Sequence, residues 1–340
     1  MPTRSITTVD YHTGGEPFRI VTDGISPLEG RTVRERRRWA AAHMDDVRCL
    51  LINEPRGHAD MYGGFVTPPD DDGADLGVVF FHNEGYSTAC GHGTIALVTW
   101  AIESGRVATG SAVASDPIKV TVDVPSGRLV CRARLDGDRR VSSVAFINVP
   151  SFVLAQDVSV ETSRGALTLD VGFGGAFYGA LDVRTIGLTV SAAALPALIA
   201  LQRELRPALG QALEVVHPVE PELRDIYGII FWEPLGGRSG TIGQRNVTVF
   251  ADGEVDRSPC GSGTSARLAM LHGRGELGVR EPFHHRSIVD SAFEASIVEV
   301  AQVAGRSAVI TEVEGSAFRT GEHTFTLDAR DTIGTGFLLR

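Results

Sequence analysis

The sequence predicts an α+β fold built from two similar domains, and three observations support this prediction. The chain has 340 residues, of which 43% are hydrophobic, a size that favours roughly two domains with room for packed cores. Short runs rich in Val, Ile and Phe are numerous and helical stretches are few, which favours mixed or antiparallel sheets over a regular βαβ alternation. A seven-residue motif also occurs twice, half a chain apart.

The strand-like runs are bounded mainly by Gly, Pro, Asp or Asn, as expected for strands that end in turns. They cover Leu76–Phe81, Ile118–Val124, Val144–Val149, Asn246–Phe250 and Ala308–Val313. Helical periodicity predicts helices over Val33–Asp45, Thr94–Ser104, Ala192–Arg206 and Ser265–Gly273.

Composition disfavours several classes of function. The formal net charge is −10, whereas a nucleic-acid-binding surface needs a basic face. The basic cluster from Arg34 to Arg38 falls in a stretch with helical periodicity, so a solvated helix face is favoured over a phosphate site. Lys119 is the one lysine and lies in an alternating strand-like segment. A pyridoxal-phosphate enzyme, which needs a Schiff-base lysine, is therefore disfavoured.

Nothing in the chain predicts export or membrane insertion. Met1 to Asp10 lacks the apolar core of a secretory signal. The longest nearly apolar stretch, Val190 to Leu201, is too short to span a bilayer and contains Pro196. We therefore expect a cytoplasmic protein without a membrane partner. In that compartment a structural disulfide is not expected, and the four cysteines form no CxxC pair.

The repeated motif places one cysteine in each half of the chain. Thr88 to Thr94 and Ser258 to Thr264 both read Ser/Thr-x-Cys-Gly-x-Gly-Thr, and their cysteines are Cys90 and Cys260. Each copy follows a strand-like run and opens a helical one. The repeat indicates two homologous domains, each with one cysteine at a helix N-terminus. The other two cysteines lie in apolar runs and are expected in the core; they are Cys49 and Cys131.

A cysteine just before a helix is suited to acid–base chemistry. The unpaired N–H groups and the positive end of the helix dipole lower the pKa of a thiol there. Glycines let the backbone approach an anion, so the same N–H groups can hold a substrate carboxylate. Two such loops face to face would remove a proton from one face of a carbon and return one to the other. The same arrangement supports α-proton removal followed by loss of a β-leaving group.

Two other interpretations of the loops are less favoured. Both fit the dinucleotide-binding pattern G-x-G-x-x-A, but no acid lies about 20 residues after the first loop to bind a ribose. Near Glu281, at the same distance after the second loop, no strand-like run precedes the acid. NAD binding is therefore disfavoured. A buried thiol in a tight turn would explain one Cys-Gly-x-Gly loop, but two matched loops argue against it.

Histidines and acids outside the motif carry less weight. The histidines lack the HxxxH or HxxH spacing, with acids, that would build a zinc site. His284 and His285 are interpreted as a surface or strand-end pair. Asp10 and Glu16 are expected to organise the first part of the chain structurally and not to touch substrate.

Together the motifs resemble the proline racemase family, which also contains hydroxyproline epimerases and trans-3-hydroxy-L-proline dehydratases. The resemblance covers essentially the whole chain. It runs through Asp10–Glu16, Glu54–His58, both cysteine loops, Gly174–Phe177, Asp256–Arg257 and Gly336–Leu339.

The resemblance implies the fold of proline racemase and diaminopimelate epimerase. In that fold two similar α/β domains face each other across a crevice, each with a mixed sheet wrapped around a central helix. We expect residues 1–150 to form the first domain, with Cys90, and residues 151–320 to form the second, with Cys260. Residues 320–340 could rejoin the first domain.

The resemblance also implies a cofactor-independent site without a metal, in which Cys90 and Cys260 form the catalytic acid/base pair. The substrate is a small molecule, hydroxyproline or proline. The substrate-binding positions that match the family motif are Gly91, His92, Asp256, Gly261 and Ser262. Asp256 would lie near the ring nitrogen and the loop amides would bind the carboxylate. For His92, a substrate contact and a helix cap are both open. The oligomeric state is also open, a homodimer being one alternative.

Fewer residues indicate which branch of the family the chain resembles. His82 to Thr88 and Glu54 to Tyr62 resemble the dehydratases, since racemases and 4-hydroxyproline epimerases often carry Leu where Ser87 stands. Ala89 favours neither branch. Cys260 favours the epimerases, because many dehydratases have Thr in its place.

The leading hypothesis is dehydration of trans-3-hydroxy-L-proline to 1-pyrroline-2-carboxylate, with side epimerase activity. A 4-hydroxyproline 2-epimerase or a proline racemase that uses both cysteines is the alternative enzyme. A non-catalytic imino-acid binder is the alternative of another class.

Overall fold

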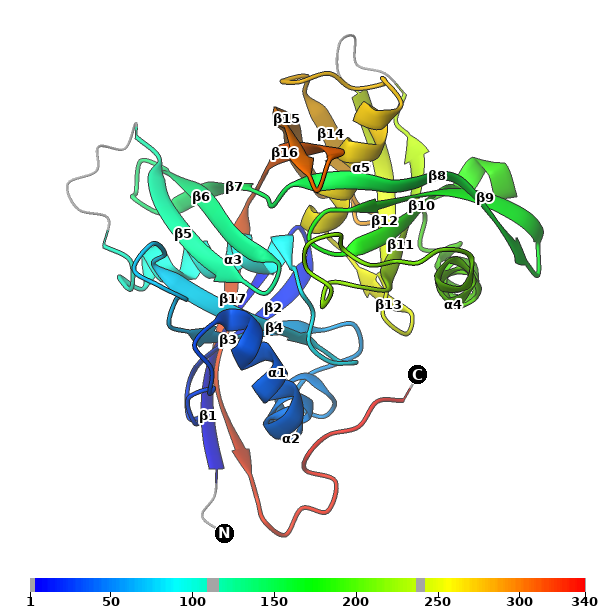
Figure 1. Ribbon diagram of the computed structural model, residues 1–340. Helices are drawn as coiled ribbons and strands as arrows, with labels where there is room; N and C mark the ends of the chain where they lie inside the picture. The colour runs from blue at the N-terminus through cyan, green and yellow to red at the C-terminus, as the bar shows by residue number, and fades with distance from the viewer. Residues whose placement is uncertain (1–3, 109–115, 237–241, 340) are drawn as a thin grey trace. The chain divides into compact units, whose positions relative to one another are not determined.

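The computed structural model describes residues 4–108, 116–236 and 242–339 (Figure 1). The chain divides into two compact units. Unit 1 contains Met1–Phe146 and Ser316–Arg340, and unit 2 contains Ile147–Gly315. The C-terminal segment thus returns to the unit in which the chain begins.

In its described residues, unit 1 combines a mixed sheet with three helices. Its strands are β1 (Arg4–Thr13), β2 (Glu16–Asp23), β3 (Tyr62–Thr67), β4 (Leu76–His82), β5 (Ile118–Val124), β6 (Gly127–Leu135), β7 (Val141–Ile147) and β17 (Ala317–Leu327). Its helices are α1 (Val33–His43), α2 (Asp45–Ile52) and α3 (Gly91–Glu103). The pairs β2–β3 and β4–β5 are parallel, whereas β17–β1, β1–β2, β3–β4 and β5–β6 are antiparallel.

Helix α3 lies at the centre of unit 1. Every residue from Gly91 to Ile102 is buried, and the helix packs against β1, β2, β3, β6 and β17. A helix that is apolar on all sides is stable only when other elements surround it. The apolar run Ile95 to Val98 therefore requires this central position, and it sets the Cys90 loop at the end of a rigid element.

Unit 2 surrounds its own central helix in the same way. Its strands are β8 (Ser151–Thr162), β9 (Gly165–Phe173), β10 (Phe177–Asp182), β11 (Ile226–Pro234), β12 (Ile242–Phe250), β13 (Glu254–Asp256), β14 (Phe283–Arg286), β15 (Ala292–Val303) and β16 (Arg306–Gly315). Its helices are the short 3₁₀ helix η1 (Val183–Ile186), α4 (Leu195–Ala212) and α5 (Gly261–Gly273).

The strand pairings of unit 2 run in a closed circle. They pass from β8 through β9, β10, β11, β12, β14, β15 and β16, and β16 pairs with β8 again through Ala308 and Phe152. Helix α5, buried from Gly261 to Leu271, packs against β8, β9, β10, β15 and β16. The expected sheet wrapped around a central helix is therefore present in each unit.

The predicted elements are found, with shifted boundaries. All five strand-like runs overlap strands, and all four predicted helices overlap helices. The two central helices begin directly after the cysteines, at Gly91 and Gly261, and not at Thr94 and Ser265. Glycine disfavours helix, but the amide of each motif threonine bonds the carbonyl of its cysteine and closes the first turn.

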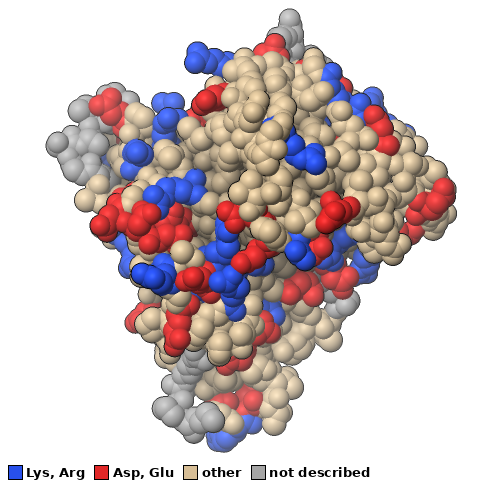
Figure 2. Space-filling model, in the orientation of Figure 1, with Lys and Arg blue, Asp and Glu red and all other residues tan. Residues whose placement is uncertain are grey.

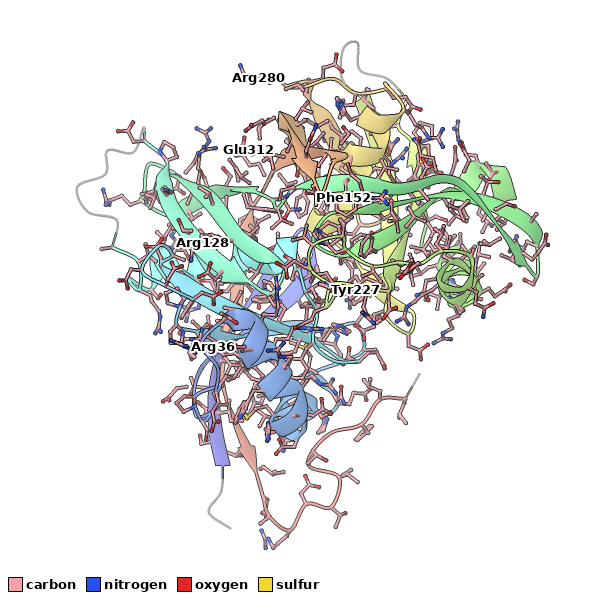
Figure 3. All side chains as sticks on the ribbon, in the orientation of Figure 1. Arg36, Arg128, Phe152, Tyr227, Arg280 and Glu312 are labelled. Carbon is pink, nitrogen blue, oxygen red and sulfur yellow. The ribbon has the colours of Figure 1, made fainter. Side chains whose placement is uncertain are left out.

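The basic cluster of α1 differs from its predicted role. Arg36, labelled in Figure 3, is buried, and its Nη1 donates to the carbonyl oxygen of Pro68 (2.6 Å). Arg37 donates to the carbonyl oxygen of Tyr86 (2.6 Å). The interpretation as a solvated helix face is therefore wrong for Arg36, because these guanidinium groups satisfy loop carbonyls beside the helix.

Basic and acidic side chains lie intermixed on the face that Figure 2 shows. Within the described part of the chain, no helix is both long and apolar enough to cross a membrane.

Candidate active site

Cys90 occupies the N-cap of α3, directly after the loop that leaves β4. Its backbone is extended (φ −154°, ψ 97°), and its Sγ accepts a hydrogen bond from the Gly93 amide at 3.3 Å. The first amides of a helix have no partner within the helix and carry the positive end of its dipole. A negative sulfur is therefore stabilised at this position.

His92 lies beside the Cys90 sulfur. Its Nε2 and Nδ1 are 3.4 Å and 3.6 Å from Sγ. The imidazole is nearly perpendicular to Tyr62 (centroids 5.0 Å apart) and to Phe18 (6.0 Å), so these rings define its orientation. The geometry adds a third role to the two predicted for His92, because the ring can hydrogen-bond the thiol itself.

Ser87 is held inside the loop that leads to Cys90. The Tyr62 hydroxyl donates to Ser87 Oγ, and Ser87 Oγ donates to the carbonyl oxygen of Ala89 (3.4 Å). Ser87 is buried. The residue that distinguishes the branches in the sequence is thus fixed by a tyrosine from β3.

One side chain joins the two stretches that resemble the dehydratases, His82 to Thr88 and Glu54 to Tyr62. Asn83 accepts from the Met61 amide (3.1 Å) and donates to Asn53 Oδ1 (2.9 Å). Both asparagines are buried. The two stretches are therefore parts of one hydrogen-bonded structure behind the Cys90 loop, a relation that their sequence separation hides.

Cys260 caps α5 with a different backbone. It has φ 65° and ψ 99°, in the left-handed half of conformational space, although it is not glycine. Such a conformation costs about 1–3 kcal/mol and persists only where neighbours enforce it. Its Sγ lies 3.8 Å from the Tyr178 hydroxyl and 4.0 Å from Ser262 Oγ.

Asp256 sets the electrostatics of the second loop. It is buried at the end of β13 and accepts a hydrogen bond from the Ser258 amide (2.8 Å). Burial raises the pKa of Asp256 to about 6. Burial and the negative charge of Asp256 raise the pKa of Cys260 well above that of a free thiol. The sequence-based expectation of a lowered pKa is therefore wrong for Cys260, which is a protonated thiol at neutral pH.

Ser262 faces a tyrosine from the neighbouring strand. Its Oγ is 2.7 Å from the hydroxyl of Tyr178, a fully buried residue of β10. Gly261 and Gly91 are the first residues of their helices, next to the thiols, and both are buried. Tyr178 was not among the predicted site residues, although it directly follows the stretch Gly174–Phe177 that the family resemblance includes.

The remaining candidates have structural surroundings. Asp10 pairs with buried Arg19 (2.7 Å), whose Nη1 also donates to the carbonyl oxygen of Arg56 (2.8 Å), an arrangement that fits the structural role expected of Asp10. Cys131 is buried as expected, whereas Cys49 is only partly buried. Of the two alternatives given for the pair, the surface position is wrong for His285, which is fully buried near the end of the short strand β14.

No three His, Cys, Asp or Glu side chains within residues 4–108, 116–236 and 242–339 are grouped closely enough to hold a metal ion.

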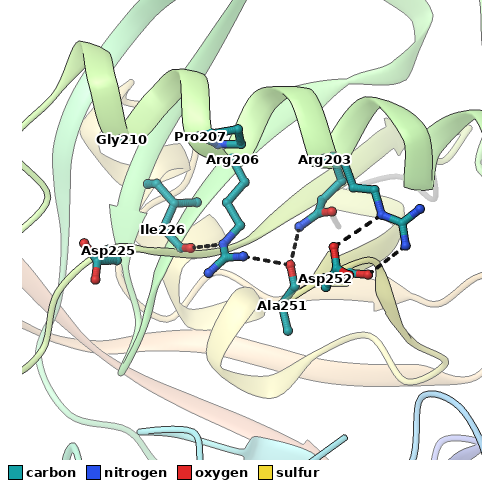
Figure 4. A pocket seen from close by; sticks show the side chains of 9 residues that line it. Arg203, Arg206, Pro207, Gly210, Asp225, Ile226, Ala251 and Asp252 are labelled. Atoms are coloured by element: carbon teal, nitrogen blue, oxygen red, sulfur yellow. Dashed lines mark hydrogen bonds and ion pairs between the residues drawn. The ribbon is translucent and has the colours of Figure 1, made fainter. Parts of the chain in front are cut away.

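A pocket of about 440 Å³ lies in unit 2 against α4 (Figure 4). Arg206 spans it, donating to the carbonyl oxygens of Ile226 (2.8 Å) and Ala251 (3.1 Å). None of the predicted site residues lines this pocket.

The fold and the loops define a protein of two α/β units, each with a thiol at the N-terminus of its central helix. The sequence model of the proline racemase family matches residues 8–338. The chain belongs to the proline racemase family.

Other proteins resemble this chain in sequence or in structure over nearly their whole length. A trans-3-hydroxy-L-proline dehydratase of Bacillus cereus is 44% identical over 333 residues, which are 98% of this chain and 98% of that protein. A 3-hydroxyproline 2-epimerase of Burkholderia multivorans is 45% identical over 339 residues, 99% of each chain. The crystal structure of a hydroxyproline epimerase from Agrobacterium vitis with bound trans-4-hydroxy-L-proline has a TM-score of 0.90 at 31% identity, covering 99% of this chain and 96% of that one.

Proposed function

We propose that this protein dehydrates trans-3-hydroxy-L-proline to 1-pyrroline-2-carboxylate, with a side epimerase activity. The observation that carries the proposal is the unequal pair of thiols: Cys90 beside a helix amide and an imidazole, Cys260 beside a buried carboxyl. One suits a base and the other an acid. The full-length 44% identity to a protein named as this dehydratase supports the choice of substrate.

In the proposed reaction Cys90 acts as a thiolate. It takes the proton from the α-carbon, and the electron pair of that C–H bond forms the double bond to the β-carbon. The bond from the β-carbon to its hydroxyl breaks, and the hydroxide leaves as water with a proton from Cys260 or from a water molecule. The resulting enamine moves one proton to carbon and becomes the cyclic imine.

The binding roles follow from charge. The amides at the start of a central helix, at Gly91 or Gly261, would hold the substrate carboxylate. Asp256, ionised above a pH of about 6, would bind the ring ammonium. Ser262 and His92 would contact the substrate beside the two thiols. No cofactor and no metal take part in these steps.

The second candidate function is epimerisation, and Cys260 is the observation that favours it. Two thiols on opposite faces of the α-carbon would invert it without loss of the hydroxyl, and a relative at 45% identity is named a 3-hydroxyproline 2-epimerase. For either function we propose a cytoplasmic location, where both thiols stay reduced.

The test is proton NMR of the purified protein in D₂O with trans-3-hydroxy-L-proline, trans-4-hydroxy-L-proline and L-proline in separate tubes. Conversion of the 3-hydroxy compound to a pyrroline, with the other two slow, is the expected result. Deuterium at the α-carbon with epimer formation, and no elimination, would establish the epimerase instead. No change in any tube, with iodoacetamide leaving both cysteines unmodified, would favour a binding protein.

A further inference from the structure

His285 connects the core of unit 2 to the Cys260 loop. It lies on β14, between β12 and β15, and is fully buried. Its Nε2 is 2.7 Å from Asn246 Nδ2, and its Nδ1 is 2.8 Å from Thr264 Oγ1. Two polar groups from separate elements thus converge on one imidazole.

The direction of each hydrogen bond follows from the donors. Asn246 Nδ2 also donates to the carbonyl oxygen of Pro259 (2.8 Å), which identifies this atom as the amide nitrogen. An amide nitrogen only donates, and Asn246 Nδ2 lies closer to Nε2 of His285 (2.7 Å) than to Nδ1 (3.3 Å). Nε2 therefore accepts and Nδ1 carries the proton. Thr264 Oγ1 accepts a hydrogen bond from Nδ1–H of His285 and donates one to the carbonyl oxygen of Cys260 (2.8 Å). The ring is neutral, because burial and nearby Arg267 lower the pKa of His285 to about 3.

The chain of bonds ends on two consecutive carbonyls, those of Pro259 and Cys260. These carbonyls flank the φ and ψ angles of Cys260, which has φ 65°. In the first loop Thr94 Oγ1 donates to the carbonyl of Cys90 in the same way (2.8 Å), yet Cys90 has an extended backbone that any residue adopts. The strained conformation therefore coincides with the additional bonds from His285 and Asn246.

We propose that His285 and Asn246 are positioning residues that hold Cys260 in its left-handed conformation and aim its thiol. The proposal deepens the proposed function, since it rests on the role of Cys260 as the acid. Without the two bonds the loop would relax to an ordinary backbone conformation. The thiol would then turn away from its buried position next to Asp256.

The first test compares His285→Leu, which fills the space without hydrogen bonds, with His285→Gln, whose amide can both accept from Asn246 and donate to Thr264. Iodoacetamide labelling at pH 8.5, read for each cysteine by mass spectrometry, gives the ratio of Cys260 to Cys90 modification. We expect this ratio to rise about tenfold in His285→Leu and to return towards the wild-type value in His285→Gln. Labelling needs no substrate, so it tests the positioning of Cys260 by His285 and Asn246 even if the proposed reaction fails.

A matched pair of variants covers the case in which His285→Leu does not fold. Thr264→Val removes the hydroxyl that links His285 to the Cys260 carbonyl by hydrogen bonds. Thr94→Val removes the corresponding hydroxyl in the first loop. We expect Thr264→Val to raise Cys260 labelling and to lower kcat for epimerisation more than KM changes. We expect Thr94→Val to leave Cys260 labelling unchanged. An unchanged Cys260 to Cys90 ratio in either His285→Leu or Thr264→Val would overturn the proposal.

Discussion

The two cysteine loops share a sequence pattern but differ in structure. Cys90 has an extended backbone and a sulfur that accepts from Gly93, whereas Cys260 has a left-handed backbone and a thiol beside Asp256. The helix N-terminus favours a negative sulfur in both loops. Both cysteines are buried, and the Gly263 amide lowers the pKa of Cys260 as expected at a helix start. Burial and the charge of Asp256 nevertheless raise that pKa well above its usual value. We infer from this comparison that neighbours outside the motif decide which thiol is the base and which is the acid of the proposed reaction.

The largest effect is expected from Cys90→Ser. A hydroxyl at this position is a far weaker base than a thiolate, so kcat/KM for dehydration should fall by at least about a thousandfold. The rate at which pyrroline forms from trans-3-hydroxy-L-proline measures this decrease. Wild-type activity in this variant would remove Cys90 from the reaction.

Cys260→Ser separates the two activities. Epimerisation needs a proton donor on the second face and should fall by at least about a hundredfold. Dehydration can take the leaving-group proton from water and should fall by about tenfold or less. Both rates can be measured by NMR in one sample. An equal loss of both activities would contradict the separate roles of the two thiols.

A matched glycine pair sharpens the comparison of the loops. A Cβ at Gly93 would lie 2.5 Å from the Phe18 ring and 2.6 Å from the Cys90 sulfur, whereas at Gly263 the nearest atom, Cys260 Sγ, is 3.0 Å away. We expect Gly93→Ala to lower kcat about a hundredfold and Gly263→Ala less than tenfold. Steady-state kinetics measure both, with circular dichroism as the control for folding. The reverse order would show that the first loop is the more adaptable one.

The smallest effect concerns stability and Asp256. Its pKa is about 6 in the folded protein against an ordinary value of 3.8, so the folded state binds the proton more tightly. The resulting stabilisation is present below about pH 4 and is lost as pH rises through about 6, a change of about 3 kcal/mol. In Asp256→Asn this dependence should be missing.

Urea unfolding of both proteins at pH 4.5 and 7.5 tests the Asp256 prediction. The variant should gain stability over the wild type at pH 7.5 and much less at pH 4.5. A constant difference between the two proteins would show that Asp256 is not buried as described.

Local features of the fold could be predicted from the sequence. The strand-like runs, the apolar helix after Cys90 and the repeated motif led to two units with thiols at helix starts, because each rests on periodicity or on a local pattern. The left-handed backbone of Cys260 could not be predicted, since both copies of the motif read alike. It depends on contacts with residues distant in the sequence.

The burial of His285 was not predicted, although a signal existed. Phe283 and His285 are two positions apart in a short strand and are both buried, while His284 is partly exposed. A period-2 interpretation of this stretch places His285 on the same face as Phe283. The partners of His285 and Tyr178, by contrast, come from other elements, and no spacing in the sequence reveals them.

The most direct test of the unequal thiols is the rate of iodoacetamide modification at each cysteine of the wild-type protein as pH is varied. Only the thiolate reacts. Cys90 is expected to react at pH 7 at least about ten times faster than Cys260, whose reaction should become fast only above the ordinary thiol pKa of about 8.5. Equal rates at pH 7, or a faster Cys260, would contradict the assignment of Cys90 as base and Cys260 as acid.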